Sequence, residues 1–130
     1  GHIIAVSSIA GRRGVAGTSA YSATKAAQIG FIESLRAEYV GTNLHASVVY
    51  PISTATEFRD AMQRQFGRVV GGAGPRQSVD DVANAIAACI VSPRPEVYPY
   101  RMAWLLAVLS VVAPGTADRI VQKYGRRRRP

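Results

Sequence analysis

The chain has 130 residues, 48% of them hydrophobic, which is enough for the core of one domain and excludes a disordered segment. Its net charge of +8 includes four arginines at 126–129, so the body carries +8 − 4 = +4, and without interleaved aromatic residues we expect no nucleic-acid partner. The single cysteine excludes an internal disulfide. The two histidines lack metal-ligand spacing, so we expect no metal site and a reducing, cytoplasmic setting.

The first residues predict a buried strand. The chain enters the apolar run HIIAV directly after Gly1, without a methionine or a charged leader, which indicates a piece of a longer protein. Residues 2–8 are rich in apolar and β-branched side chains, a pattern typical of a strand buried on both faces of a parallel sheet. Residues 9–18, rich in glycine and arginine, are expected to form a loop with Arg12 and Arg13 on its surface.

A long helix is predicted over residues 19–40, because good helix formers continue there without a proline. Residues 43–51 are a second strand candidate, which Pro51 ends because proline has no N–H for a strand ladder. Strand, helix and strand at this spacing predict a right-handed βαβ crossover. Residues 56–66 are interpreted as a short amphipathic helix and residues 67–78 as a glycine-rich loop.

Ser78 and the aspartates after it predict the start of a helix that runs to residue 92. Residues 94–100 contain prolines, which restrict a third strand to a short segment at an edge or a strand end. The apolar residues 101–113 fall short of the roughly 20 that a bilayer span needs, so no transmembrane helix is expected. A small helix is predicted over residues 115–125.

Polar side chains are expected to meet at one rim of the sheet. Ser8 ends the first strand, Tyr21 and Lys25 lie near the start of the following helix, and residues 51–56 leave the second strand. Because parallel strands bind ligands at their carboxyl ends, these groups should lie close together. Positions i and i+4 share one helical face, so Tyr21 and Lys25 should lean toward the same point.

A phenol beside an ammonium group has a chemical use. A free phenol has a pKa near 10 and is a poor acid–base catalyst at neutral pH. A lysine cation about 5 Å away, at an effective dielectric constant near 20, favours the phenolate by roughly 3 kcal/mol. Such a pair therefore suits general acid–base catalysis, and a serine hydroxyl beside it can both donate to and accept from a substrate oxygen.

Ser8 thirteen positions before Tyr21, the stretch YSATK and the proline-led turn PISTAT occur in this order, over about residues 1–92. They resemble the catalytic serine, the Tyr-x-x-x-Lys pair and the nicotinamide loop of the short-chain dehydrogenases/reductases. The resemblance implies an α/β fold, with residues 1–100 as the C-terminal half of a Rossmann-like doubly wound parallel sheet. Residues 101–130 would be an apolar helical extension with a basic tail, and the family's Gly-rich cofactor-binding turn would lie upstream.

The resemblance also implies an NAD(P)-dependent oxidoreductase that interconverts a carbonyl and an alcohol. Tyr21 would transfer the proton, Lys25 would activate the tyrosine and hold the nicotinamide ribose hydroxyls, and Ser8 would orient the substrate oxygen. The cofactor, NAD or NADP, would be bound by Tyr21, Lys25, Pro51, Ile52, Thr54 and Thr56.

Within this loop, the Thr54 backbone would contact the nicotinamide carboxamide, and Thr56 would add a hydroxyl. Ile52 stands where the family usually has glycine, which indicates a turn without a positive φ angle. The implied substrate is a small carbonyl or alcohol, and the apolar residues 101–113 favour a lipophilic one.

Each candidate residue also has a purely structural interpretation. Ser8 could end a strand, Tyr21 could be a core aromatic residue and Lys25 could be a solvated charge on the helix. Their occurrence together, in the order and at the spacing of the family, favours the enzyme hypothesis. The rival hypothesis is a non-catalytic binding module, or one peripheral to a membrane, that uses Trp104, its apolar neighbours and the arginine tail for contact. A membrane surface is therefore the alternative to a purely cytoplasmic location.

Small residues form a stripe along the long helix, which permits close approach of another helix. This small-residue stripe consists of Ala23, Ala27, Gly30 and Ser34. It could pack within the monomer. The family resemblance implies instead that it pairs subunits, so a homo-oligomer is expected.

Overall fold

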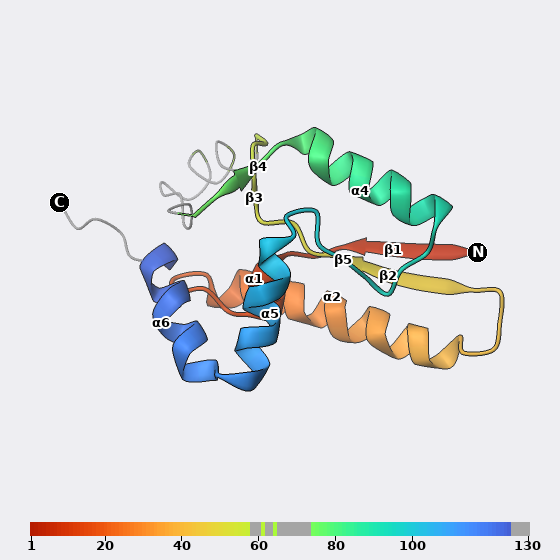
Figure 1. Cartoon of the computed structure of the whole chain (residues 1–130), viewed down its shortest axis with the longest axis horizontal. Helices are drawn as coiled ribbons and strands as arrows, with labels where there is room; N and C mark the ends of the chain where they lie inside the picture. Colours follow the sequence, from red (N-terminus) through yellow and green to blue (C-terminus); the bar gives the residue numbers. More distant parts are fainter. Residues whose placement is uncertain (58–60, 62–63, 65–73, 126–130) are drawn as a thin grey trace.

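The computed structural model describes residues 1–57, 61, 64 and 74–125 (Figure 1). Three parallel strands, β1 (His2–Val6), β2 (His45–Val49) and β5 (Glu96–Val97), form a sheet in the order β1-β2-β5. Helix α2 (Ser19–Glu38) connects β1 to β2, and α4 (Val79–Val91) precedes β5. The predicted succession of strand, helix and parallel strand is confirmed.

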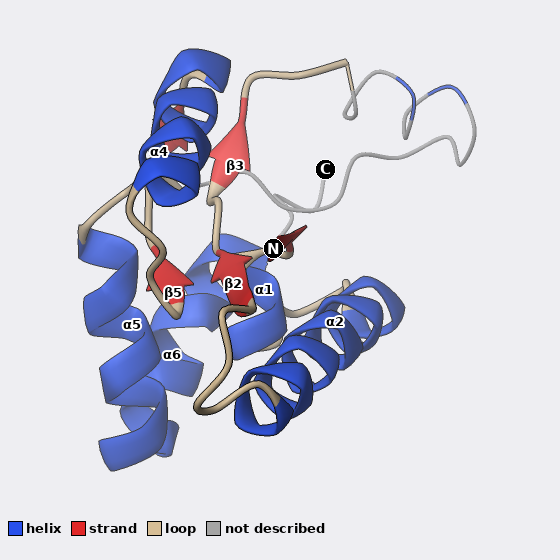
Figure 2. Ribbon diagram, turned by 90° about the vertical axis from the view of Figure 1, so that its right-hand side faces the viewer, coloured by secondary structure: helices blue, strands red, loops and turns tan. Residues whose placement is uncertain are grey.

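Helices cover both faces of the sheet. Figure 2 shows α4 on one side of the strands and α2 on the other. Alternate residues of a strand point to opposite faces, so Val48 packs against Ile32 of α2, whereas Val49 packs in a second cluster with Cys89 of α4. Burial of one such side chain contributes about 1.5–3 kcal/mol. These two cores confirm the doubly wound arrangement, and the single cysteine, Cys89, is a buried member of the second core.

Local signals define the helix ends. Helix α4 begins with a capping box, in which the Ser78 hydroxyl accepts from the Asp81 N–H at 3.0 Å and the Asp81 carboxylate accepts from the Ser78 N–H at 3.1 Å. Hydrogen bonding of the Asp81 carboxylate to the Ser78 side chain, and to the Ser78 backbone N–H, lowers the pKa of Asp81. Helix α2 ends at Glu38, two residues earlier than predicted, and Gly41 follows with φ +81°.

The burial of β1 differs from the prediction. Ile3 is 45% exposed and Val6 43% exposed, although the sequence pattern indicates a strand buried on both faces. The reason is topological, because β1 lies at the edge of the sheet and has a neighbouring strand, β2, on one side. The sequence pattern indicates that these residues suit a buried strand. The exposed fraction of each side chain depends on the position of β1 in the strand order.

Three short elements were not predicted. Residues Ile9–Arg12 form the single helical turn α1 inside the expected loop. Strand β3 (Ser53–Thr54) pairs in parallel with β4 (Arg76–Gln77). All three elements are too short to show a hydrophobic period. Most of the helix and of the glycine-rich loop expected over 56–66 and 67–78 lies outside the described residues.

The C-terminal segment forms a helical hairpin. Helix α5 (Met102–Val112) contacts α1 and α6 (Pro114–Gly125), and Pro114 occupies the first helical position, where its missing N–H costs nothing. The Arg13 guanidinium donates to the Pro114 carbonyl at 3.0 Å and forms an ion pair with Asp118. Arg13 therefore ties the hairpin to the segment before α2. Among the described helices, none is long and apolar enough to cross a bilayer.

Candidate active site

Ser7 and Ser8 follow β1 at its carboxyl end and have different partners. The Ser7 N–H extends the strand ladder to the Val49 carbonyl at 2.9 Å, and its buried hydroxyl donates to the Lys25 carbonyl at 2.9 Å. The half-buried Ser8 is the N-cap of α1, and its hydroxyl accepts from the Ala10 N–H at 3.1 Å. A serine hydroxyl that accepts one hydrogen bond still has a proton to donate. Ser8 is thus the serine that suits contact with a substrate.

Helix α1 lies directly against the backbone of α2 and the end of β2. The Ile9 N–H donates to the Pro51 carbonyl at 3.0 Å. A Cβ atom at Gly11 would lie 2.8 Å from the Lys25 carbonyl carbon and 2.9 Å from its oxygen, closer than a side chain normally comes to backbone. Only glycine permits this close approach to the Lys25 backbone. Helix α1, which begins after Ser8, is therefore packed on Lys25 through Gly11 and hydrogen-bonded to Pro51 through Ile9.

Tyr21 and Lys25 lie one turn apart on α2, as predicted. The Lys25 Nζ atom is 5.9 Å from the centre of the Tyr21 ring. It also donates to the Val6 carbonyl at 3.1 Å and to the Gln28 side-chain oxygen at 3.2 Å. Burial lowers the pKa of Lys25, because desolvation disfavours the charged ammonium. The hydrogen bond to the Val6 carbonyl anchors the Lys25 ammonium at the carboxyl end of β1.

The loop after β2 is ordered by contacts of its own. The Thr54 hydroxyl donates to the Ile52 carbonyl at 3.0 Å and accepts from the Gln77 side-chain amide at 3.3 Å. The Thr56 N–H donates to the Thr54 carbonyl at 3.0 Å. Within the described ranges no residue other than glycine has a positive φ angle, which confirms the interpretation of Ile52. Helix α1 thus connects Ser8 to Lys25 and Pro51. The hydrogen bond from Gln77 connects Thr54 to β4.

Sequence reasoning missed Gln77. Its side chain is 7% exposed, and its Oε1 atom has no hydrogen-bond partner among the residues that the structure describes. An unpaired buried acceptor costs about 1–3 kcal/mol, so a donor is expected there when the site is complete. Gln77 follows the glycine-rich segment, and no sequence pattern marks it as part of a site.

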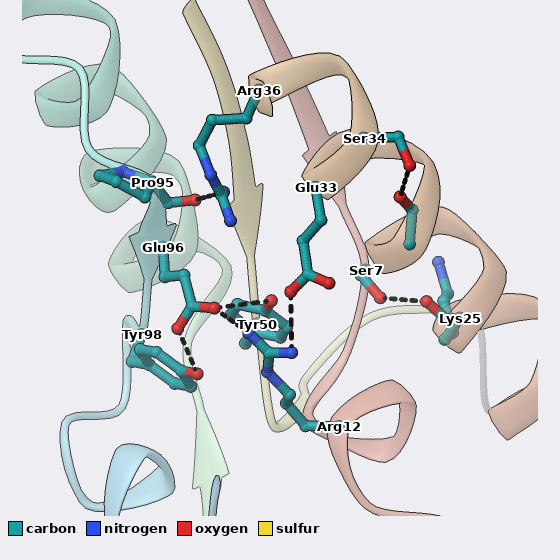
Figure 3. A network of polar contacts seen from close by, with 11 residues as sticks. Ser7, Arg12, Lys25, Glu33, Ser34, Arg36, Tyr50, Pro95, Glu96 and Tyr98 are labelled. Atoms are coloured by element: carbon teal, nitrogen blue, oxygen red, sulfur yellow. Dashed lines mark hydrogen bonds and ion pairs between the residues drawn. The ribbon is translucent and has the colours of Figure 1, made fainter. Parts of the chain in front are cut away.

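The expectation that Arg12 lies on a loop surface is wrong. Figure 3 shows its guanidinium between Glu33 of α2 and Glu96 of β5, with which it forms ion pairs. The guanidinium carbon lies 5.1 Å from the centre of the Tyr50 ring, and Tyr50 stacks on Tyr98 at 4.7 Å. Burial raises the pKa of both phenols. A basic residue in a glycine-rich segment carries no sequence signal for such a position.

A pocket of about 620 Å³ lies between the segment before α2 and helix α6. It is lined by Gly14, Val15, Ala16, Gly17, Ser19, Asp118, Arg119, Val121 and Gln122. Its lining does not include Ser8, Tyr21 or Lys25. The predicted catalytic side chains lie instead on the rim formed by β1, α1 and α2.

The family model for the short chain dehydrogenases matches residues 1–66 of the chain, a stretch that includes Ser8, Tyr21, Lys25 and the loop after β2. The chain is 30% identical to a ketoacyl reductase, HetN, of Nostoc, over 96% of the chain and 45% of that protein. It is 31% identical to a hydroxysteroid 11-beta-dehydrogenase 1-like protein of Xenopus laevis, over 95% of the chain and 42% of that protein.

A solved structure has the same fold. The short chain dehydrogenase of Burkholderia cenocepacia, in complex with NADP, superposes with a TM-score of 0.72 at 26% identity, over 93% of this chain and 47% of that one. The chain therefore spans less than half of the length of the relatives named above.

Proposed function

Because this chain belongs to the short chain dehydrogenase family, we propose that it carries the proton-transfer residues of an NAD(P)-dependent oxidoreductase that interconverts a carbonyl and an alcohol. The observation that carries the proposal is the position of Lys25, anchored on the Val6 carbonyl beside the Tyr21 ring. Residues 1–100 would form the catalytic half of the nucleotide-binding domain, and 101–130 its helical extension. The activity belongs to the whole protein, of which this chain supplies one part.

In the proposed reaction Tyr21 gives its phenolic proton to the substrate carbonyl oxygen during reduction and takes it back during oxidation. Ser8 donates a hydrogen bond to the same oxygen and so orients it. The ammonium of Lys25 favours the phenolate that Tyr21 becomes, because opposite charges attract across a short distance. When bound, the reduced cofactor NAD(P)H would supply the hydride for carbonyl reduction, and the oxidised cofactor NAD(P)⁺ would accept the hydride in alcohol oxidation.

The residues present fit a nicotinamide cofactor. Lys25 and Tyr21 would meet the ribose hydroxyls, and the loop of Pro51, Ile52, Thr54 and Thr56 would meet the carboxamide. The unpaired Gln77 acceptor beside Thr54 supports this assignment, since a carboxamide carries N–H donors. The NADP in the Burkholderia cenocepacia enzyme supports it as well.

The direct test is turnover by the full-length protein with NADH and NADPH, followed by nicotinamide absorbance. The substrates would be a series of ketones and aldehydes of increasing apolar length, because the exposed apolar side chains of α5 favour a lipophilic substrate. We expect turnover with at least one cofactor and a KM that falls as the apolar part lengthens. Tight cofactor binding without turnover of any substrate would favour the non-catalytic module.

A homo-oligomer is part of the proposal. The small-residue stripe on α2 is exposed along its whole length, and Phe31 between its members is exposed too. Small side chains let two helix backbones approach closely, so a second copy of α2 fits this face.

Contact with an anionic membrane surface is a second proposal, and α5 supports it. Six large apolar side chains of α5 are exposed: Met102, Trp104, Leu105, Val108, Val111 and Val112. Residues 98–130 contain seven basic residues and one acidic residue, 7 − 1 = +6 of the total +8. A helix with exposed apolar side chains, in a sequence region that is rich in basic residues, suits the headgroup region of anionic lipids.

In vesicle sedimentation, the full-length protein is expected to pellet with phosphatidylserine-containing vesicles and to be released by salt. Exposed charges are screened within about 10 Å at 0.1 M salt, so the electrostatic contribution to vesicle binding should disappear first as salt is added. Deletion of residues 126–130 should weaken binding and leave turnover unchanged. Salt-insensitive binding that survives the deletion would assign the contact to Trp104 and its apolar neighbours, and absence of binding to any vesicle would contradict the proposal.

A further inference from the structure

Helix α1 needs external support. It consists of four residues, and a single helical turn is not stable by itself because nucleation costs more than one hydrogen bond returns. Its first residue is fixed by the hydrogen bond from Ile9 to Pro51, and Gly11 rests on the Lys25 backbone. Its last residue, Arg12, extends its side chain along the α2 face of the sheet, to Glu33 of α2 and Glu96 of β5. The position of Ser8 at the N-cap therefore depends on what holds Arg12.

Arg12 is held by two carboxylates from different elements. Its guanidinium pairs with Glu33 of α2 at 2.9 Å and with Glu96 of β5, and the three side chains are between 28% and 40% exposed. Glu96 is itself fixed, because it accepts from the Tyr98 hydroxyl at 2.9 Å and from the Tyr50 hydroxyl at 3.4 Å. A planar guanidinium can serve two carboxylates at once, which an ammonium cannot do with the same geometry.

The same guanidinium lies over the ring of the fully buried Tyr50, which directly precedes Pro51 (Figure 3). The backbone of Tyr50 is fixed to β5 by the hydrogen bond from its N–H to the Val97 carbonyl at 2.8 Å. Arg12 thus contacts the residue before the proposed nicotinamide loop and at the same time ends the turn that Ser8 begins. The Arg12 side chain therefore connects α1, which begins at Ser8, to the loop that follows β2.

We propose that Arg12 is a positioning residue, which holds α1 against Glu33, Glu96 and Tyr50 and thereby fixes the Ser8 hydroxyl relative to Lys25 and the loop after β2. This inference rests on the proposed function for the role of Ser8, whereas the support of α1 by Arg12 is independent of it. Arg12 touches neither substrate nor cofactor in this assignment.

The test uses the full-length protein with Arg12→Met, which keeps the length of the side chain and removes the charge, and with Arg12→Lys, which keeps the charge. Arg36→Met is the matched control, because Arg36 lies on α2 and donates to the Pro95 carbonyl at 3.1 Å, a hydrogen bond that does not involve α1. Amide hydrogen exchange at Ala10 and Gly11 reports on α1 directly, since both N–H groups bond to Ser8. We expect faster exchange in Arg12→Met, a smaller effect in Arg12→Lys and none in the control.

Kinetics then test the link to Ser8. Arg12→Met should lower kcat by on the order of 10- to 100-fold with little change in the KM for NAD(P)H, because a displacement of about 1 Å costs that much. If Arg12 acts through Ser8, adding Arg12→Met to Ser8→Ala should have little further effect, as expected for two residues of one unit.

Unchanged exchange at Ala10 and Gly11 in a folded Arg12→Met protein would overturn the proposal. Fully additive effects of Arg12→Met and Ser8→Ala on kcat would overturn the link to Ser8. If exchange increases but the unmodified protein has no turnover, the proposed function fails and the support of α1 by Arg12 stands.

Discussion

Replacing Tyr21 with phenylalanine in the full-length protein is expected to abolish hydride transfer while NAD(P) still binds. The substitution removes the one hydroxyl that would exchange a proton with the substrate oxygen and leaves the ring beside Lys25 in place. General acid–base catalysis contributes about 10²- to 10⁴-fold, so kcat should fall by at least that much. Steady-state turnover and calorimetric titration with the cofactor measure the two quantities separately.

The control for Tyr21→Phe is Tyr39→Phe, which removes a hydroxyl at the other end of the same helix, where Tyr39 packs against the core of α2 and β2. Its turnover should match that of the unmodified protein. Lys25→Ala should reduce both turnover and cofactor binding, because Lys25 is assigned to both. Near-native turnover in Tyr21→Phe would show that the proton comes from another group.

Gly11→Ala should destabilise the protein and lower turnover together. The added methyl group would lie 2.8 Å from the Lys25 carbonyl carbon and 2.9 Å from Cδ1 of Ile29. Backbone atoms of a long helix cannot move aside as a flexible side chain can, so α1 must shift away from α2. Overpacking of this kind costs about 1–3 kcal/mol, and thermal denaturation of the full-length protein would measure it as a lower Tm.

Gly14→Ala provides the comparison in the same segment, since a Cβ atom there would meet its nearest neighbour, Cβ of Ser22, at an ordinary 3.9 Å. Its free energy of unfolding should stay within about 0.5 kcal/mol of the unmodified value. Equal Tm values for Gly11→Ala and Gly14→Ala would mean that α1 is free to move, which contradicts its proposed role in placing Ser8.

Several features of this protein can be derived from its sequence because their causes are local. The β-branched runs of β1 and β2 and the proline-free α2 carry their own periodicity, and the capping box of Ser78 and Asp81 lies within four residues. The pairing of Tyr21 with Lys25 follows from helix geometry alone. The family resemblance of Ser8, YSATK and PISTAT agrees with the match to the family model.

Other features depend on contacts between residues far apart in the sequence, and no local pattern encodes them. Helix α1 is capped by Ser8 and is held by contacts with Pro51, with the Lys25 backbone and with carboxylates of α2 and β5. The β5 carboxylate, Glu96, is 84 residues from Arg12 in the sequence. The strand order decides that Ile3 and Val6 are exposed at an edge, although their chemistry suits a core. Gln77 lies in β4, which pairs with the distant β3, and its side-chain oxygen is buried there. Helix and strand formation depend mainly on neighbouring residues, whereas the burial and pairing of single polar groups depend on which segments fold against one another.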